Sequence, residues 1–221
     1  MAHLFRYLFF ILFLKPFLFL FIGMNVRHRE RLPTRGPLVV TANHNSHLDA
    51  WVLMNLFSLS RLWKIRPVAA ADYFMKNRFT AWISLTLIGI VPISRTVSGA
   101  VRDPLKACCQ ELEDGQILIF FPEGTRGEPE QRSTLRSGIA HLSRRYPEIP
   151  VVPIFLHGTG KALPRRSLLL VPFNCDVFIG DPLTWNGDRD QFMKSLESAL
   201  QTLSEEHHLC TEKEGKDDAF E

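Results

Sequence analysis

The hydrophobic residues of this 221-residue chain follow two different patterns, one at the N-terminus and one in the body. The run from Tyr7 to Met24 is almost entirely apolar, and only Lys15-Pro16 interrupts it. From Leu38 onward, short apolar runs alternate with segments in which apolar residues recur every three or four positions. Short runs rich in β-branched residues indicate buried strands, whereas the longer spacing indicates helices. The pattern therefore predicts an apolar N-terminal segment joined to a body of alternating strands and helices.

The predicted elements of the body follow one another as strand and helix. Strands are expected at residues 38–42, 67–70, 89–93, 116–120, 149–155 and 171–179. Helices are expected to begin near Ser46 and to cover 79–87, 104–113, 137–146 and 190–203. Alternation of this kind is typical of an α/β sandwich. The fold class predicted is α/β, with a mixed, largely parallel sheet flanked by helices.

The N-terminal segment, residues 1–24, is predicted to anchor the chain in a membrane. As a single helix, 7–24 would measure about 27 Å, close to the roughly 30 Å of a hydrocarbon core. A central lysine costs about 2.5 to 3.5 kcal/mol on insertion scales, and Pro16 kinks a helix, but the many apolar residues still favour insertion. Three arrangements stay open: a bent or re-entrant helical pair in one leaflet, which the interruption favours, a kinked single span, and a buried soluble helix.

Charge divides the rest of the chain into a basic domain, 25–204, and an acidic tail, 205–221. The tail has seven acidic residues against two lysines, so with a total of +3 residues 1–204 together carry +8. A segment of this composition is predicted to be disordered. A basic body favours anionic partners such as phospholipid headgroups. Nucleic acid is not expected, because no recognised binding module accompanies the charge.

Arginines and cysteines bear on where the protein works. The arginines that follow Met24 match the bias of cytoplasmic segments, so the domain is predicted to lie on the cytoplasmic face of a membrane; they are Arg27, Arg29, Arg31 and Arg35. No small-x-small cleavage site follows Met24, which disfavours a cleaved signal peptide. The four cysteines show no C-x-x-C spacing and are expected to be reduced, buried thiols.

A first polar stretch, residues 43–49 (NHNSHLD), follows the strand predicted at its N-terminal side. Histidine accepts protons near neutral pH, so His44 is a candidate general base. Asp49 could orient it if His44 precedes the next helix and Asp49 lies in the first turn, an arrangement that the capping-box-like spacing of Ser46 and Asp49 provides. Asp49 could instead serve its helix alone, and Asn43 could hold the loop or donate to an oxyanion.

A second polar stretch, residues 121–126 (FPEGTR), follows another predicted strand. Its Arg126, and Arg95 after a third strand, carry planar guanidinium groups suited to phosphate. Glu123 could pair with Arg126 or bind an acceptor hydroxyl, and Gly124 allows a close backbone approach. Useful loops in such sheets lie at the carboxyl ends of strands, so we expect a base and an anion clamp at one edge.

Two other functions are compatible with some of these residues. His44, His47, Asp49 and His157 could in principle bind zinc in a metal hydrolase, although the spacing does not place the two neighbouring histidines on one helical face. No metal site is predicted. The other alternative is a membrane-bound lipid-binding or scaffold protein without activity, and the complete polar motifs count against it.

Four motifs in this order resemble the lysophosphatidic acid acyltransferase (1-acylglycerol-3-phosphate acyltransferase) family of membrane-bound glycerolipid acyltransferases. The resemblance covers roughly residues 25 to 185, and its motifs lie at 43–49, 89–95, 121–126 and 151–154. Two positions depart from the family pattern: Asn45 stands where Gln or Arg is commoner, and Pro92 interrupts an apolar run. The resemblance implies a glycerol-3-phosphate acyltransferase-like sheet with a pair of N-terminal anchoring helices.

The resemblance also implies a reaction and roles for residues. An acyl group would pass from acyl-CoA or acyl-carrier protein, a co-substrate with no further cofactor, to the free hydroxyl of a lysophospholipid. Lysophosphatidic acid is the default acceptor, giving phosphatidic acid, and another lysolipid or lyso-aminolipid stays open. His44 would be the base and Asp49 its orienter, with Pro153 on the acyl-donor side. The residues implied to bind the glycerol-phosphate end of the acceptor are Asn43, Arg95, Glu123, Gly124, Thr125 and Arg126.

Overall fold

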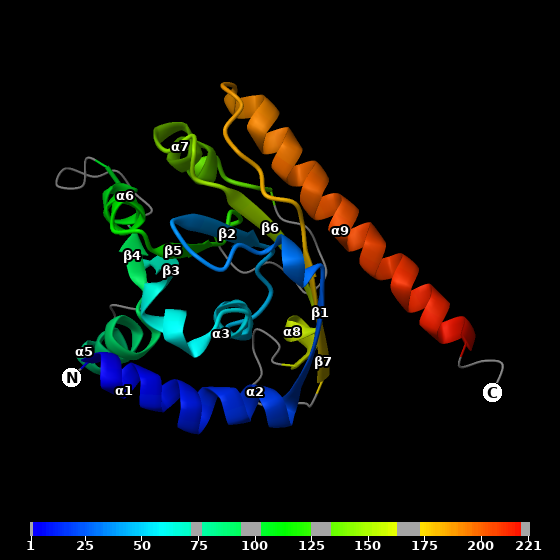
Figure 1. The fold of residues 1–221 in the computed structure, drawn as a ribbon, viewed down its shortest axis with the longest axis horizontal. Coiled ribbons are helices and arrows are strands. Elements are labelled where there is room, and N and C mark those ends of the chain that lie inside the picture. The colour runs from blue at the N-terminus through cyan, green and yellow to red at the C-terminus, as the bar shows by residue number, and fades with distance from the viewer. Residues whose placement is uncertain (1, 72–76, 94–102, 125–133, 163–172, 218–221) are drawn as a thin grey trace.

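A seven-stranded sheet forms the centre of the computed structural model, which describes residues 2–71, 77–93, 103–124, 134–162 and 173–217 (Figure 1). The strand order is β1-β7-β6-β2-β5-β3-β4. The strands are β1 (Ile22–Arg27), β2 (Leu38–Ala42), β3 (Ile65–Ala70), β4 (Val91–Ile93), β5 (Ile117–Phe120), β6 (Val151–His157) and β7 (Phe173–Ile179).

The sheet is mixed and largely parallel, as the sequence predicts. Strands β6, β2, β5, β3 and β4 are paired in parallel. Strand β7 is antiparallel to β6, and β1 is parallel to β7, so the last two strands on this side of the sheet run the other way. The carboxyl ends of β2, β5 and β6 therefore lie at one edge of the sheet, where the loops that follow them can meet.

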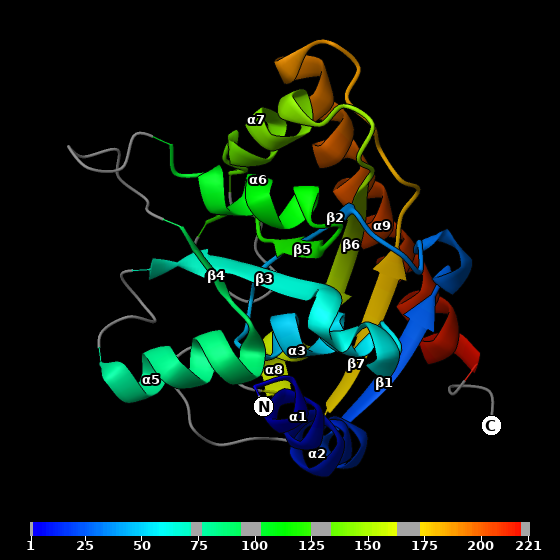
Figure 2. The ribbon, with the colours of Figure 1, turned by 60° about the vertical axis from the view of Figure 1, so that its left-hand side comes forward.

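Helices cover both faces of the sheet (Figures 1 and 2). One face is packed by the N-terminal helices and α3, with α5 beside α1, and the other face by α6, α7 and α9. The helices are α1 (Ala2–Phe9), α2 (Lys15–Phe21), α3 (Leu48–Asn55), α5 (Arg78–Ile83), α6 (Lys106–Glu113), α7 (Gly138–Arg145), α8 (Thr159–Ala162) and α9 (Arg189–Asp217). Short 3-10 turns occupy Arg29–Arg31 and Leu59–Lys64.

Successive side chains of the central strands contribute alternately to the two hydrophobic layers, one on each face of the sheet. On β2, Leu38 and Val40 join the layer beneath α3, whereas Val39 joins the layer beneath α6 and α7. On β5, Ile117 and Leu118 divide in the same way. Successive side chains of a strand point to opposite faces, and a strand buried on both faces reads as a continuous apolar run. This is why the strands could be recognised from their composition.

The N-terminal segment is one continuous helical run, not the predicted helical pair. A π turn, Phe10–Leu14, joins α1 directly to α2, and the Lys15 amide donates to the Phe10 carbonyl. Pro16 has no amide hydrogen to donate, and the irregular turn before it accommodates this loss within the helix. The prediction of two helices separated at Lys15-Pro16 is wrong for this reason.

The apolar segment also belongs to the fold of the domain. Phe10, Leu14 and Leu18 are buried in the core beneath the sheet. The predicted boundary at residue 24 is wrong, because the helix ends at Phe21 and the next residue begins β1, which pairs with β7. Sequence reasoning missed this edge strand, since its first residues continue the apolar run.

The predicted disordered tail is also wrong over residues 205–217. Helix α9 runs from Arg189 to Asp217, well beyond the predicted end at residue 203. Its apolar side chains Phe192, Leu196 and Leu203 are buried against the sheet, and so is His207 within the supposed tail. The helix therefore packs on the sheet with side chains of its first half, 189–204, and also with His207 of the acidic segment.

Three of the four cysteines are buried thiols, as expected; they are Cys108, Cys109 and Cys175. Burial raises the pKa of the Cys108 thiol to about 12, because the thiolate would be desolvated. A thiol in this environment behaves as a small apolar side chain.

Two leucines of the N-terminal helix provide a matched test of its packing. Leu18 is 1% exposed and Leu20 is 69% exposed. Leu18→Ala should lower the free energy of unfolding by about 2 to 5 kcal/mol, because it leaves a cavity in the core. Leu20→Ala should change it by less than about 0.5 kcal/mol. Thermal unfolding in a mild detergent measures both, and equal effects would show that the helix does not pack on the domain.

Candidate active site

The loop between β2 and α3 carries the first polar motif, and Asn43 fixes the loop to the neighbouring strand. The Asn43 amide nitrogen donates to the Leu156 carbonyl at 2.8 Å, and the Leu156 amide donates to the Asn43 side-chain oxygen at 2.8 Å. This pair of bonds continues the β2–β6 ladder one step beyond Ala42 and Ile154. The structure thus places Asn43 in the first of its two predicted roles, that of holding the loop.

Asp49 organises the loop from the first turn of α3. Its side chain is 0% exposed, and one oxygen, Oδ2, accepts three hydrogen bonds. The donors are His44 Nδ1 at 2.9 Å, the Asn45 amide at 2.7 Å and the Ser46 amide at 2.8 Å. A carboxylate at a helix N-terminus is also favoured by the helix dipole. Asp49 therefore caps its helix and orients His44, so the two predicted roles coexist.

The Asp49 contact decides which nitrogen of His44 is available for chemistry. A carboxylate can only accept, so Nδ1 of His44 carries the hydrogen and Nε2 keeps a free lone pair. The imidazole also stacks on Phe121, with ring centroids 4.0 Å apart and planes 19° apart. Phe121 therefore holds the face of the ring and Asp49 holds its Nδ1 edge, so Nε2 is positioned to act as a base.

Glu123 links the second polar motif to the first. Its carboxylate is 5% exposed, and Oε1 accepts a hydrogen bond from the His44 backbone amide at 3.2 Å. Sequence reasoning considered Glu123 only as a partner of Arg126 or of substrate, and missed this contact. A backbone amide carries no residue-specific signal, so the sequence could not have indicated it.

Gly124 is required by the conformation of the turn and by a close neighbour. Its φ of +71° is in the left-handed region, which glycine adopts without strain. A Cβ at this position would lie 2.9 Å from Cδ and Nε of Arg136. The exposed Arg136 therefore lies beside the turn, and its amide donates to the Pro122 carbonyl at 2.8 Å. The sequence does not predict this position, because nothing distinguishes Arg136 from an ordinary surface arginine before a helix.

Some predicted residues cannot be placed at this edge. Arg95, Thr125 and Arg126 lie outside the described residues. Pro153 is buried in β6, and a Cβ at Gly180 would lie 2.9 Å from its Cγ. That contact is with the end of β7 and not with His44, and the acyl-donor role of Pro153 stays a prediction.

The four alternative zinc ligands do not come together. Within the described part of the chain, no three His, Cys, Asp or Glu side chains are grouped so that they could hold one metal ion. His157 instead packs against His207 of α9, with ring centroids 4.0 Å apart. His44 and Asp49 bind each other, while His157 packs on α9, so these residues do not surround one point as zinc ligands would.

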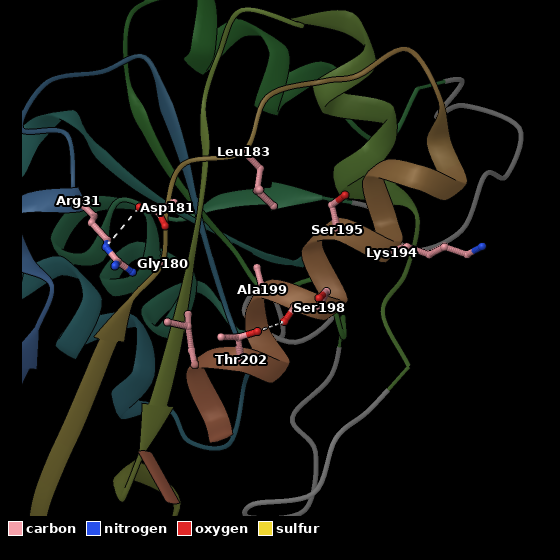
Figure 3. Close-up of a pocket in the computed structure, with 10 residues that line it drawn as sticks. Arg31, Gly180, Asp181, Leu183, Lys194, Ser195, Ser198, Ala199 and Thr202 are labelled. Atoms are coloured by element: carbon pink, nitrogen blue, oxygen red, sulfur yellow. Dashed lines mark hydrogen bonds and ion pairs between the residues drawn. The ribbon is translucent and has the colours of Figure 1, made fainter. Parts of the chain in front are cut away.

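A cavity of about 560 Å³ lies elsewhere, between α9 and the segment that follows β7 (Figure 3). Arg31 and Asp181 form an ion pair at its rim, with 3.3 Å between Nε and Oδ1. The segment that follows β7 runs antiparallel to β6, and its Leu183 pairs with Val151 at the start of β6. The cavity is thus at the edge opposite to His44 and does not form part of the candidate site.

Comparison with known proteins shows the family of the chain. A sequence model of the family described as "Acyltransferase" matches residues 23–157, more than half of the chain. The chain belongs to the acyltransferase family. The matched region of this family member contains the His44–Asp49 pair and the turn at Glu123 and Gly124.

Individual relatives of this family member share one name. It is 32% identical to a chloroplastic 1-acyl-sn-glycerol-3-phosphate acyltransferase of Arabidopsis thaliana, over 74% of this chain and 44% of that protein. It is 31% identical to a chloroplastic protein of the same name from Brassica napus, over 66% of this chain and 41% of the relative. The chain thus spans less than half the length of these two curated relatives.

The fold matches a solved structure. The crystal structure of the 1-acyl-sn-glycerophosphate acyltransferase PlsC from Thermotoga maritima superposes with a TM-score of 0.69 at 23% identity. The match covers 88% of this chain and 76% of the other. The predicted glycerol-3-phosphate acyltransferase-like architecture is thereby confirmed at the level of the fold.

The role of Asp49 can be tested by one substitution. Asp49→Asn keeps the shape of the side chain but replaces the carboxylate that faces His44 by an amide. An amide can donate as well as accept, so it no longer fixes the tautomer of the imidazole. Acyl transfer should fall by about 10³-fold in kcat, with little change in the KM for the acceptor. Asp190→Asn, an exposed position on α9, is the matched control. A kcat within twofold of the parent, in a variant with an unchanged Tm, would exclude the orienting role.

Proposed function

We propose that the chain is a membrane-associated acyltransferase that acylates the free hydroxyl of a lysophospholipid, with lysophosphatidic acid as the preferred acceptor and phosphatidic acid as the product. The observation that carries the proposal is the His44–Asp49 pair, in which a buried carboxylate leaves Nε2 as the basic nitrogen. The printed names of the relatives support the choice of acceptor. Acyl-CoA or acyl-carrier protein is the proposed donor, with no further cofactor.

The proposed reaction is a direct transfer. Nε2 of His44 removes the proton of the acceptor hydroxyl as its oxygen attacks the thioester carbonyl carbon. The tetrahedral intermediate then expels the thiolate, and the imidazolium returns the proton to the sulfur. The products are an ester and a free thiol. The sequence has no Gly-x-Ser-x-Gly motif, which agrees with transfer that does not pass through an acyl-enzyme.

Access to a lipid acceptor is proposed to come from the N-terminal helix. Residues 4–21 form a helix that is long and apolar enough, by length and composition, to cross a membrane. Its buried side chains contribute to the core of the domain, and spanning a bilayer would withdraw them from it. We therefore favour a helix that lies in the plane of the interface, with the exposed face in the lipid. The basic segment after Met24 favours the cytoplasmic face.

One panel of assays tests the proposal. Purified protein in lipid vesicles is supplied with acyl-CoA or acyl-carrier protein and with lysophosphatidic acid, other lysophospholipids, glycerol phosphate or a lyso-aminolipid. Phosphatidic acid should be the main product. Preferred acylation of a different lysolipid would replace the proposed acceptor, and no acylation of any acceptor would overturn the proposed activity.

His44→Ala should abolish thioester-dependent acylation and leave vesicle binding intact, because the base is lost while the apolar surface is unchanged. We expect a fall of at least about 10²-fold, the contribution of a general base. His141→Ala, an exposed position on α7, is the matched control and should retain full turnover. Near-normal turnover of His44→Ala would remove the base from the mechanism.

Arg126→Ala should weaken acceptors that carry a phosphate more than neutral ones. The reason is the motif position of Arg126, since guanidinium binds phosphate through two parallel hydrogen bonds. The KM for lysophosphatidic acid should rise about tenfold or more, while the KM for monoacylglycerol changes little. Equal losses with both acceptors would exclude a phosphate clamp at this residue.

A further inference from the structure

Helix α5 exposes large apolar side chains on the surface. Phe79 is 70% exposed, Trp82 is 51% exposed and Leu85, in the π turn that follows, is 41% exposed. None of the residues of α5 is buried. A short helix that packs so little of its own surface needs a covering environment, and the described chain supplies none over these side chains.

The exposed face of α5 adjoins that of the N-terminal helix. Helix α1 packs on the π turn Ser84–Ile88 that continues α5. Arg6, buried at 3% exposure, fixes this contact, because its Nη2 donates to the carbonyls of Ile65 and Ile88 at 2.8 Å each. In Figures 1 and 2 both helices lie along the same lower side of the molecule, and α5 points away from α1 in Figure 2.

We take the exposed apolar side chains of these two neighbouring helices together and name them the basal surface. It consists of the exposed residues Leu4, Phe5, Leu8, Leu12, Phe13, Phe19 and Leu20 of the N-terminal helix and Phe79, Trp82 and Leu85 of the α5 segment.

The charge around the basal surface indicates its partner. The sequence has no Asp or Glu in the described residues of the N-terminal helix, 2–21, and none in those of the α5 segment, 77–88. Lys15 and the exposed Arg78 supply positive charge within these two segments. Aromatic and aliphatic side chains accompanied by lysine and arginine, on two segments that themselves carry no carboxylate, match an anionic lipid leaflet.

We propose that helix α5 is a second membrane-binding element, which enters the lipid interface beside the N-terminal helix. This inference rests on the proposed function only in taking the substrate to reside in a membrane. A single helix lying in a membrane leaves the protein free to rotate about that helix axis. A second helix that points in another direction removes this freedom and fixes the orientation of the domain on the bilayer.

The test compares vesicle binding of variants of the full chain. Phe79→Gln combined with Trp82→Gln should lower partition onto phosphatidylcholine–phosphatidylglycerol vesicles at least about tenfold. The reason is that polar side chains replace two aromatic side chains that would be buried in the lipid. The matched control is Leu209→Gln, which removes an apolar side chain that is 60% exposed on α9. It should bind as the parent does. An unchanged Tm of each variant establishes that the fold is intact.

A spectroscopic measurement locates α5 directly. Brominated lipids quench the fluorescence of tryptophans that enter the bilayer, and Trp82→Phe removes this fluorophore while keeping an aromatic ring. This variant should bind vesicles as the parent does and lose part of the quenching. Undiminished quenching, or vesicle binding of the double Gln variant equal to that of the parent, would overturn the proposal and assign the α5 face to a partner other than lipid.

Turnover separates this inference from the proposed function. The double Gln variant should lose acylation of vesicle-embedded acceptor and keep that of acceptor dispersed in detergent. Equal loss in both formats would overturn the membrane role of α5. If the parent protein acylates nothing in any format, the proposed function fails, while the vesicle-binding comparison still decides the role of α5.

Discussion

The buried carboxylate of Asp49 is the constraint on which the candidate site depends. A single oxygen accepts hydrogen bonds from two backbone amides and from the imidazole of His44. One carboxylate therefore closes the loop, caps α3 and selects the tautomer of the base. A buried charge is stable only when hydrogen bonds replace its hydration. The loop geometry and the chemistry of His44 therefore have the same cause, and neither can change without the other.

The parallel sheet explains why residues far apart in sequence reach this loop. Asn43 pairs with Leu156 of β6, and Phe121 and Glu123, which follow β5, contact the ring and the backbone of His44. Both neighbouring strands are parallel to β2, so their carboxyl ends deliver loops to the same edge. The base is thus held by its own helix and by both neighbouring strands.

Much of this arrangement could be predicted from sequence, because its causes are local. Apolar runs such as 38–42 mark strands buried on both faces, and the spacing of Ser46 and Asp49 marks the start of α3. The features that were missed depend on distant partners. The edge strand β1 requires β7, and the acidic half of α9 requires the sheet beneath it. Composition alone could not indicate either contact.

The N-terminal helix and the candidate site are connected through the sheet itself. The helix ends at Phe21 and β1 starts at Ile22, which pairs with Phe173 at the beginning of β7. Strand β7 is antiparallel to β6, and Asp176 in the middle of β7 pairs with His157 at the carboxyl end of β6, so the beginning of β7 extends past that end. That is the edge at which His44 lies. A helix that rests in a membrane would therefore bring the edge of the sheet that carries His44, rather than the opposite one, close to the membrane surface.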